Sequence, residues 1–176
     1  DLETYNFKEQ KKYYKSSLWR YNNNLSIDKI VFKNDKKKIE FTEELITSIK
    51  DFASISGDKL LLRVNVFNLN TNTPKRYRNR KLPLKIRRGY MDVDEFTITI
   101  PKSYSVDGAL FAERKIENKF GKYSISLEKI SEDKLLYKRT LLIKDGLYKK
   151  EDYKDYRSFR RKVSRNDNLK IALTKK

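Results

Sequence analysis

Hydrophobic and polar residues alternate with a two-residue period in several stretches of the chain. The clearest are residues 60–66, 96–100, 123–127 and 135–143. Alternation places one side of a strand in a core and the other in solvent, which is typical of antiparallel sheets. The polar segment 131–134 would join the last two stretches into a hairpin, and Asp145-Gly146 would end the second of them.

Two other segments show helical spacing instead. The N-terminal one would be stopped by the three asparagines at 22–24, and its apolar face consists of Phe7, Tyr14, Leu18 and Tyr21. Near the C-terminus, acidic residues precede a second stripe and basic residues follow it, a polarity that suits the helix macrodipole. That stripe consists of Tyr153, Tyr156, Phe159 and Val163. We expect a helix over about 150–165 that packs on a sheet, followed by a final strand through Leu169, Ile171 and Leu173.

Residues 39–56 fit two patterns. Phe41, Leu45 and Ile49 suit a strand face with Ile39, or a helix face with Phe52. Thr and Ser recur there, and Gly57-Asp58 offers a turn into the next stretch, so we favour a strand. Many short strands predict a mainly β protein, an antiparallel β-sandwich with an N-terminal helix and one packed C-terminal helix.

The composition excludes several kinds of chemistry. The 176 residues include no Cys and no His, which excludes Cys–His and Ser–His–Asp catalysis and the usual soft ligands of zinc. We therefore expect no catalytic residue, no metal site and no cofactor, although residue types alone leave a Ser–Lys dyad, paired carboxylates or calcium open. The 12 Tyr and 9 Phe indicate a globular domain rather than disorder. No apolar run approaches the roughly 20 residues needed to span a bilayer.

The chain is strongly basic, with 42 Lys and Arg against 24 acidic residues and a formal charge of +18. Eight of these basic residues fall within residues 75–88. The candidate contacts for an anion or a partner are Lys75, Arg76, Tyr77, Arg78, Arg80, Arg87 and Arg88. They could bind single-stranded nucleic acid with the tyrosine stacked on bases, or an anionic surface such as lipopolysaccharide, acidic glycan or phospholipid. We favour a solvated loop and a charged edge strand, because basic residues are spread along the whole chain.

Asp92, Asp94 and Glu95 place three carboxylates within four residues. A calcium loop would also need its fixed Gly and a later Glu, and a glycosidase pair would need a counterpart carboxylate. Alternation puts Asp92 and Asp94 on one side of an extended segment and Glu95 on the other, so we expect a solvated strand entry. We interpret Gly121 as a turn or bulge, and the aromatic stripe at 153–159 as part of the core.

A series of short segments after residue 62 carries a family resemblance by its order. The segments are residues 67–68, 74–77, 80–84, 89–96, 100–104, 120–123, 135–139 and 146–148, followed by Tyr153, Tyr156, Phe159 and Asp167. In this order they resemble the C-terminal domain of unknown function that follows the catalytic core of bacterial transglutaminase-like proteins. The chain departs from that pattern at residues 106–109, where a turn with a Pro is usual.

The resemblance implies a jelly-roll-like sandwich in an exported bacterial protein, in the periplasm or at the cell surface. The Cys, His and Asp of the transglutaminase-like core would then lie upstream, and the start at Asp1 without a Met fits the removal of an upstream portion. Residues 1–24 would be a helical connector from that upstream domain, and residues 25–176 the sandwich domain, including the helix at about 150–165. The connector is rich in aromatic residues, so Tyr13, Tyr14 and Trp19 are candidate interdomain contacts. The alternative is that this helix folds back on its own sandwich.

We therefore expect a non-catalytic accessory domain of an exported transglutaminase-like protein. It would position the upstream catalytic core, or bind a partner or glycan. The alternative is a polyanion or nucleic-acid binding module that uses the basic 75–88 segment, with nucleic acid disfavoured because no recognised motif accompanies the run. An independent carbohydrate-active enzyme ranks last, because no catalytic pair of carboxylates can be named.

Overall fold

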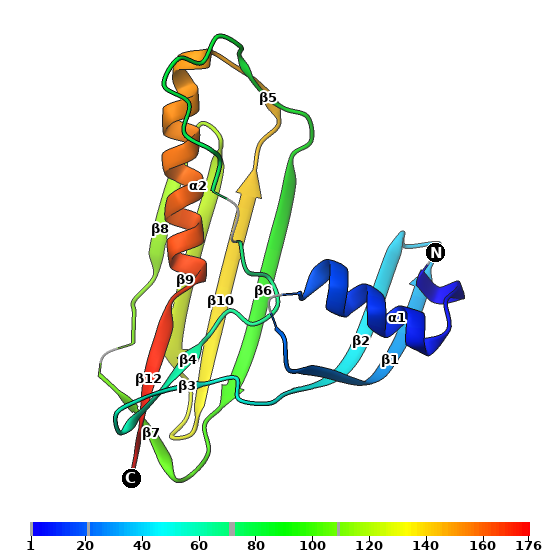
Figure 1. The fold of residues 1–176 in the computed structure, drawn as a ribbon, viewed down its shortest axis with the longest axis vertical. Helices are drawn as coiled ribbons and strands as arrows, with labels where there is room; N and C mark the ends of the chain where they lie inside the picture. Colours follow the sequence, from blue (N-terminus) through cyan, green and yellow to red (C-terminus); the bar gives the residue numbers. More distant parts are fainter. Residues whose placement is uncertain (1, 21, 71–72, 109) are drawn as a thin grey trace. The chain divides into compact units, whose positions relative to one another are not determined.

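The computed structural model describes residues 2–20, 22–70, 73–108 and 110–176. The chain divides into two compact units, residues 1–54 and residues 55–176. Figure 1 shows the elements of both units coloured along the chain. The division places residues 25–54 with the N-terminal helix, and the assignment of residues 25–176 to one sandwich domain stays a prediction.

The first unit is a helical segment with a long β-hairpin. Its helices are η1 (Leu2–Thr4), α1 (Phe7–Tyr13) and the π-helical turn η2 (Tyr14–Leu18), and its strands are β1 (Leu25–Asp35) and β2 (Glu40–Ile49). The sequence starts α1 with a capping box, because Asn6 accepts a hydrogen bond from the backbone N–H of Glu9 at 3.0 Å and Glu9 accepts one from that of Asn6 at 3.1 Å. The strand interpretation of the ambiguous segment is confirmed by β2. Within the predicted helix face Tyr14 is buried, whereas Phe7 and Leu18 are exposed; Tyr21 lies outside the described residues.

The second unit consists of three antiparallel sheets and one long helix. Its elements are β3 (Ser54–Ser56, which begins one residue before the division), β4 (Lys59–Arg63), β5 (Leu84–Ile86), β6 (Tyr90–Thr99), β7 (Tyr104–Asp107), β8 (Arg114–Asn118), β9 (Gly121–Lys129), β10 (Lys134–Ile143), β11 (Gly146–Tyr148), η3 (Lys150–Asp152), α2 (Tyr153–Asp167) and β12 (Lys170–Lys175). The sheets have the orders β6-β10-β9-β8, β3-β4-β12-β7 and β11-β5. The predicted hairpin across residues 131–134 is present as β9–β10.

One hydrophobic core joins the two four-stranded sheets and α2. The alternating residues of β9 and β10 are buried on one face, among them Tyr123, Ile125, Leu135 and Leu141. Residues of α2 and β12 pack into the same cluster; they include Phe159, Val163, Ile171 and Leu173. In Figure 1, α2 and β12 follow one another along the long sheet that contains β9 and β10. The mainly β, antiparallel prediction with an N-terminal and a packed C-terminal helix is therefore confirmed, and two sheets around one core are compatible with the predicted sandwich.

Candidate anion-binding groove

Two hydrogen bonds hold the segment after Pro74 alongside α2. The hydroxyl of Tyr153 donates to the carbonyl oxygen of Lys75 at 2.7 Å, and Nε of Arg157 donates to that of Pro74 at 2.9 Å. Both donors lie in the first half of α2, where the salt bridge from Lys119 to Asp152 at 2.5 Å ties down the preceding turn. The hydrogen bond that Lys119 donates within this salt bridge lowers the pKa of Asp152, so the Asp152 carboxylate stays ionised. The basic loop is therefore fixed against the helix by its own backbone.

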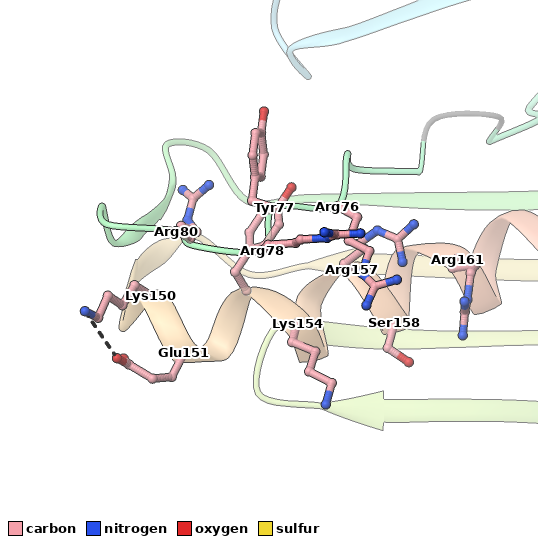
Figure 2. Close-up of a pocket in the computed structure, with 11 residues that line it drawn as sticks. Arg76, Tyr77, Arg78, Arg80, Lys150, Glu151, Lys154, Arg157, Ser158 and Arg161 are labelled. Atoms are coloured by element: carbon pink, nitrogen blue, oxygen red, sulfur yellow. Dashed lines mark ion pairs between the residues drawn. The ribbon is translucent and has the colours of Figure 1, made fainter.

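Between this loop and α2 lies a groove of about 880 Å³. It is lined by Arg76, Tyr77, Arg78, Arg80, Lys150, Glu151, Tyr153, Lys154, Arg157, Ser158 and Arg161. Figure 2 shows Arg80 and Lys150 toward one end of these residues and Arg161 toward the other. Seven of the lining side chains are cations and one is a carboxylate. The groove therefore concentrates positive charge along the helix.

These cations are mostly without an acidic partner. Among the described residues, Lys150 is the one groove cation within 4.0 Å of a carboxylate oxygen, with Glu151 at 3.8 Å. Five of the seven are arginines, whose planar guanidinium groups suit bidentate binding of phosphate or carboxylate. The arrangement is therefore suited to binding an anion with several charged groups.

Aromatic rings support one end of the groove. The guanidinium of Arg80 lies 4.3 Å from the ring centroid of Tyr153 and 5.9 Å from that of Tyr77. Its Nη2 donates to the carbonyl oxygen of Pro83 at 3.0 Å. Such stacking fixes the direction of the guanidinium. Tyr77 itself remains 54% exposed, so one face of the loop keeps an accessible ring.

The structure brings together part of the predicted basic site. Arg76, Tyr77, Arg78 and Arg80 line the groove, whereas the side chains of Lys75, Arg87 and Arg88 are exposed outside its lining. The half of the site that comes from the helical segment was not predicted from the sequence. Its basic residues are Lys150, Lys154, Arg157 and Arg161. Their spacing of four, three and four residues is the helical signal that could have found them.

A buried ionic cluster lies on the core face of the long sheet. Arg139 of β10 is 1% exposed; its Nε and Nη2 donate to Asp167 at 2.7 and 3.0 Å, and its Nη1 donates to Asp94 at 2.8 Å. Asp167 also accepts from the Tyr123 hydroxyl at 2.8 Å and from the backbone N–H of Asn70 at 3.1 Å. Burial, and then the charge of Asp167, raise the pKa of Tyr123, so this phenol stays protonated and donates.

The expectation of a solvated strand entry at residues 92–95 is therefore wrong for the first two carboxylates. Asp94 is bound by Arg139 and by the side-chain amide of Asn68, at 3.1 Å, while burial raises the pKa of Asp92. Both side chains lie on the covered face of β6, because they are in phase with Phe96 and Ile98, which pack against the core. The described residues contain no group of acidic side chains placed to hold a metal ion. Asp94 acts as a hydrogen-bond acceptor of the buried Arg139.

The candidate interdomain residues lie together in the first unit. The rings of Tyr14 and Trp19 stack at 5.1 Å, and Tyr13 meets Tyr14 edge-on at 5.6 Å. Tyr14 is fully buried, and this burial, with the nearby carboxylate of Glu43, raises its pKa. Tyr13 is exposed. Their contact with another domain stays a prediction.

Comparisons with known proteins find a matching family and one distant structural similarity. A family model described as "Domain of Unknown Function with solved-structure structure (DUF3858)" matches residues 58–173. A crystal structure described as "a putative protease" from Parabacteroides distasonis ATCC 8503 aligns at 16% identity and a TM-score of 0.48. The alignment covers 57% of this chain and 19% of that one, so this chain spans about a fifth of its length. No curated protein matches. None of the helices in the described parts of the chain is long and apolar enough to cross a membrane.

Proposed function

The chain belongs to the DUF3858 family, and on that premise we propose that its second unit is a non-catalytic accessory domain that binds an anionic partner in the groove beside α2. The wider setting is an exported bacterial protein with a transglutaminase-like core upstream. This setting is proposed from the order of segments between residues 62 and 167.

The observation that supports anion binding is the set of groove cations without acidic partners. On an ordinary protein surface, basic residues are interspersed with acidic ones and form exposed ion pairs with them. Here seven cations line one groove with a single carboxylate. Their mutual repulsion is relieved when an anion binds, and release of the counterions of a polyanion adds to the affinity.

A non-catalytic role follows from the chemistry that the chain lacks and from where its carboxylates lie. It has no Cys and no His. Asp94 and Asp167 are bound to Arg139 inside the core, where they do not face the groove residues. The groove lining is dominated by cations, and its one carboxylate, Glu151, is paired with Lys150.

Single-stranded nucleic acid is a second candidate because Tyr77 is half exposed beside the cations. Nucleic-acid modules of this kind stack successive bases on several aromatic rings. The other ring in the lining, Tyr153, is buried and covered by Arg80. One accessible ring favours anion binding that is indifferent to base sequence.

The test compares two triple variants of the same charge. Arg78→Gln/Lys154→Gln/Arg161→Gln removes three exposed groove cations, and Lys102→Gln/Lys129→Gln/Lys134→Gln removes three exposed cations outside the groove lining. Binding to heparin is measured by titration over a range of NaCl concentrations. The groove variant should lower the slope of log affinity against log salt by roughly two to three units, and the control by less than about one. Equal slopes for the two variants would contradict the proposal.

A further inference from the structure

Two strongly exposed leucines lie at the end of the second unit where α2 begins. Leu82 and Leu147 are each 72% exposed. Leu147 of β11 pairs with Lys85 of β5, and Leu82 precedes Lys85 by three residues, at most about 10 Å of extended chain. Figure 1 shows β5 at the end of the second unit from which α2 starts. We refer to residues 77–88 and 144–150 as the tip.

The tip is also strongly basic. Outside the groove lining, its exposed cations are Lys81, Lys85, Arg87, Arg88, Lys144 and Lys149. Asp145 is the acidic residue of the tip. Arg78, Arg80 and Lys150 belong both to the tip and to the groove, so the positive surface continues from one to the other.

The combination of cations and exposed leucines indicates which class of anionic partner fits the tip. A soluble polyanion would contact the cations and gain nothing from bare aliphatic side chains. At the surface of an anionic bilayer, basic residues bind the headgroups while apolar side chains enter the boundary between headgroups and acyl chains. Single exposed leucines are common on proteins, but here two of them stand among cations.

We propose that the tip docks on an anionic phospholipid surface, with Leu82 and Leu147 inserted at the headgroup boundary and the groove cations on the lipid phosphates. This rests on the proposed function, because the groove supplies the anion contacts that the leucines supplement. The resulting attachment is peripheral and reversible, since two short side chains and a basic surface bind far more weakly than a spanning helix.

Sedimentation with vesicles tests the proposal on the full chain. Vesicles of phosphatidylcholine are compared with vesicles that also contain about 30% phosphatidylglycerol, which provides the negative surface potential. The variant is Leu82→Ser/Leu147→Ser, and the matched control is Met91→Ser/Ile130→Ser, which replaces two exposed apolar residues outside the tip. The native chain should bind the anionic vesicles and not the neutral ones. The leucine variant should bind at least about tenfold more weakly, and the control within about twofold of the native chain.

A fluorescent variant gives an independent measurement. In Leu147→Trp the emission should shift to the blue on addition of anionic vesicles, beyond any shift of the native chain with its single Trp19. Unchanged emission from vesicle-bound protein would overturn insertion of this residue, whatever the stability of the serine variant.

Heparin separates the failure of this inference from failure of the proposed function. Heparin binding with no vesicle binding, or vesicle binding that is equal in the leucine variant and the native chain, overturns the bilayer proposal and leaves the anion-binding groove in place. Binding to neither overturns both. Preference for an acidic glycan or a nucleic acid over anionic vesicles at equal salt would assign the groove to that polymer instead.

Discussion

Arg139 stands at a position where the sequence pattern alone would place an apolar residue. It is in phase with Leu135, Tyr137 and Leu141, all of which are buried. The guanidinium is tolerated there because three of its nitrogens donate to Asp94 and Asp167. A buried ion pair of this kind contributes less by its presence than its disruption costs.

We therefore expect Asp167→Ala to destabilise the protein by about 3–5 kcal/mol, the usual cost of leaving one buried partner charged. The change would remove the acceptor of Arg139, Tyr123 and the backbone of Asn70 at once. Urea unfolding followed by circular dichroism measures the difference. Asp155→Ala is the control, because Asp155 is an exposed acid on the same helix, and it should change stability by less than about 0.5 kcal/mol. Equal midpoints for the two variants would show that Asp167 is dispensable.

Gly121 begins β9 at a close approach to the neighbouring strand. A Cβ at this position would overlap the backbone carbonyl oxygen of Leu142, so the strands would have to separate. We expect Gly121→Ala to cost at least about 2 kcal/mol. Gly57→Ala is the comparison, since Gly57 has φ +62° and open space around it, and backbone strain alone costs about 1 kcal/mol or slightly more. Similar losses in thermal or urea unfolding would mean that the sheet adjusts to the added methyl group.

At the scale of elements, helix α2 has one face that packs against the core and another that borders the groove. Its aromatic and aliphatic residues pack into the core, and three of its basic residues, Lys154, Arg157 and Arg161, line the groove. The aromatic stripe was predicted as core, and this is confirmed for Tyr153, Phe159 and Val163, which are buried. The two faces are coupled because any loosening of the core face also moves the groove cations.

Truncation of the core face should therefore destabilise the protein strongly. Phe159 is 1% exposed, and Phe159→Ala should cost about 3–5 kcal/mol, the usual range for emptying a buried Phe site. Lys162→Ala, at an exposed position of the same helix, should stay within about 0.5 kcal/mol of the native chain. The measurement is chemical unfolding of both variants. An unfolding midpoint unchanged by Phe159→Ala would contradict the packing described for α2.

The elements that the sequence predicts are those with an uninterrupted period. Strands β9 and β10, the second half of β6 and helix α2 keep one phase. Strand β1 does not, because a register irregularity between Ile27 and Lys29 shifts its phase and is followed by the apolar run Ile30, Val31 and Phe32. Strands β5 and β11 have three residues each, too few for any period to appear.

The candidate site was half predictable for a similar reason. The loop cations form a run that is visible in the sequence. Tyr153 and Arg157 of α2, which hold the loop beside the helix, lie 78 and 83 residues from the carbonyl groups that they bind. Asp94 was predicted to be exposed, and this was wrong. Alternation places Asp94 on the same face as Phe96 and Ile98, but it does not reveal the buried Arg139 that binds the carboxylate there. Pairings of this kind depend on tertiary structure.

At the scale of the whole molecule, the proposed function assigns the second unit to binding rather than to catalysis. We expect the chain to show no amidase, transamidase or peptidase turnover, because it has no Cys and no His and two of its core carboxylates are bound to Arg139. Release of ammonia from glutamine peptides, amine incorporation and peptide cleavage are the measurements. Turnover that survives repurification and is lost on a point mutation would contradict this.

The ionic cluster in the core also fixes how the long sheet can assemble. Arg139 lies opposite Asp94 in the β6–β10 ladder. If β6 slid by one residue, its side chains would change faces: Asp94, Phe96 and Ile98 would turn to solvent, and Thr97 would turn inward. The guanidinium would then lose its contact with Asp94, and Val93 or Glu95 would lie opposite it instead. Such a misaligned sheet loses the Asp94 contact and the burial of Phe96 and Ile98 together, so the native alignment is favoured. Arg139 thus acts as a check on strand alignment.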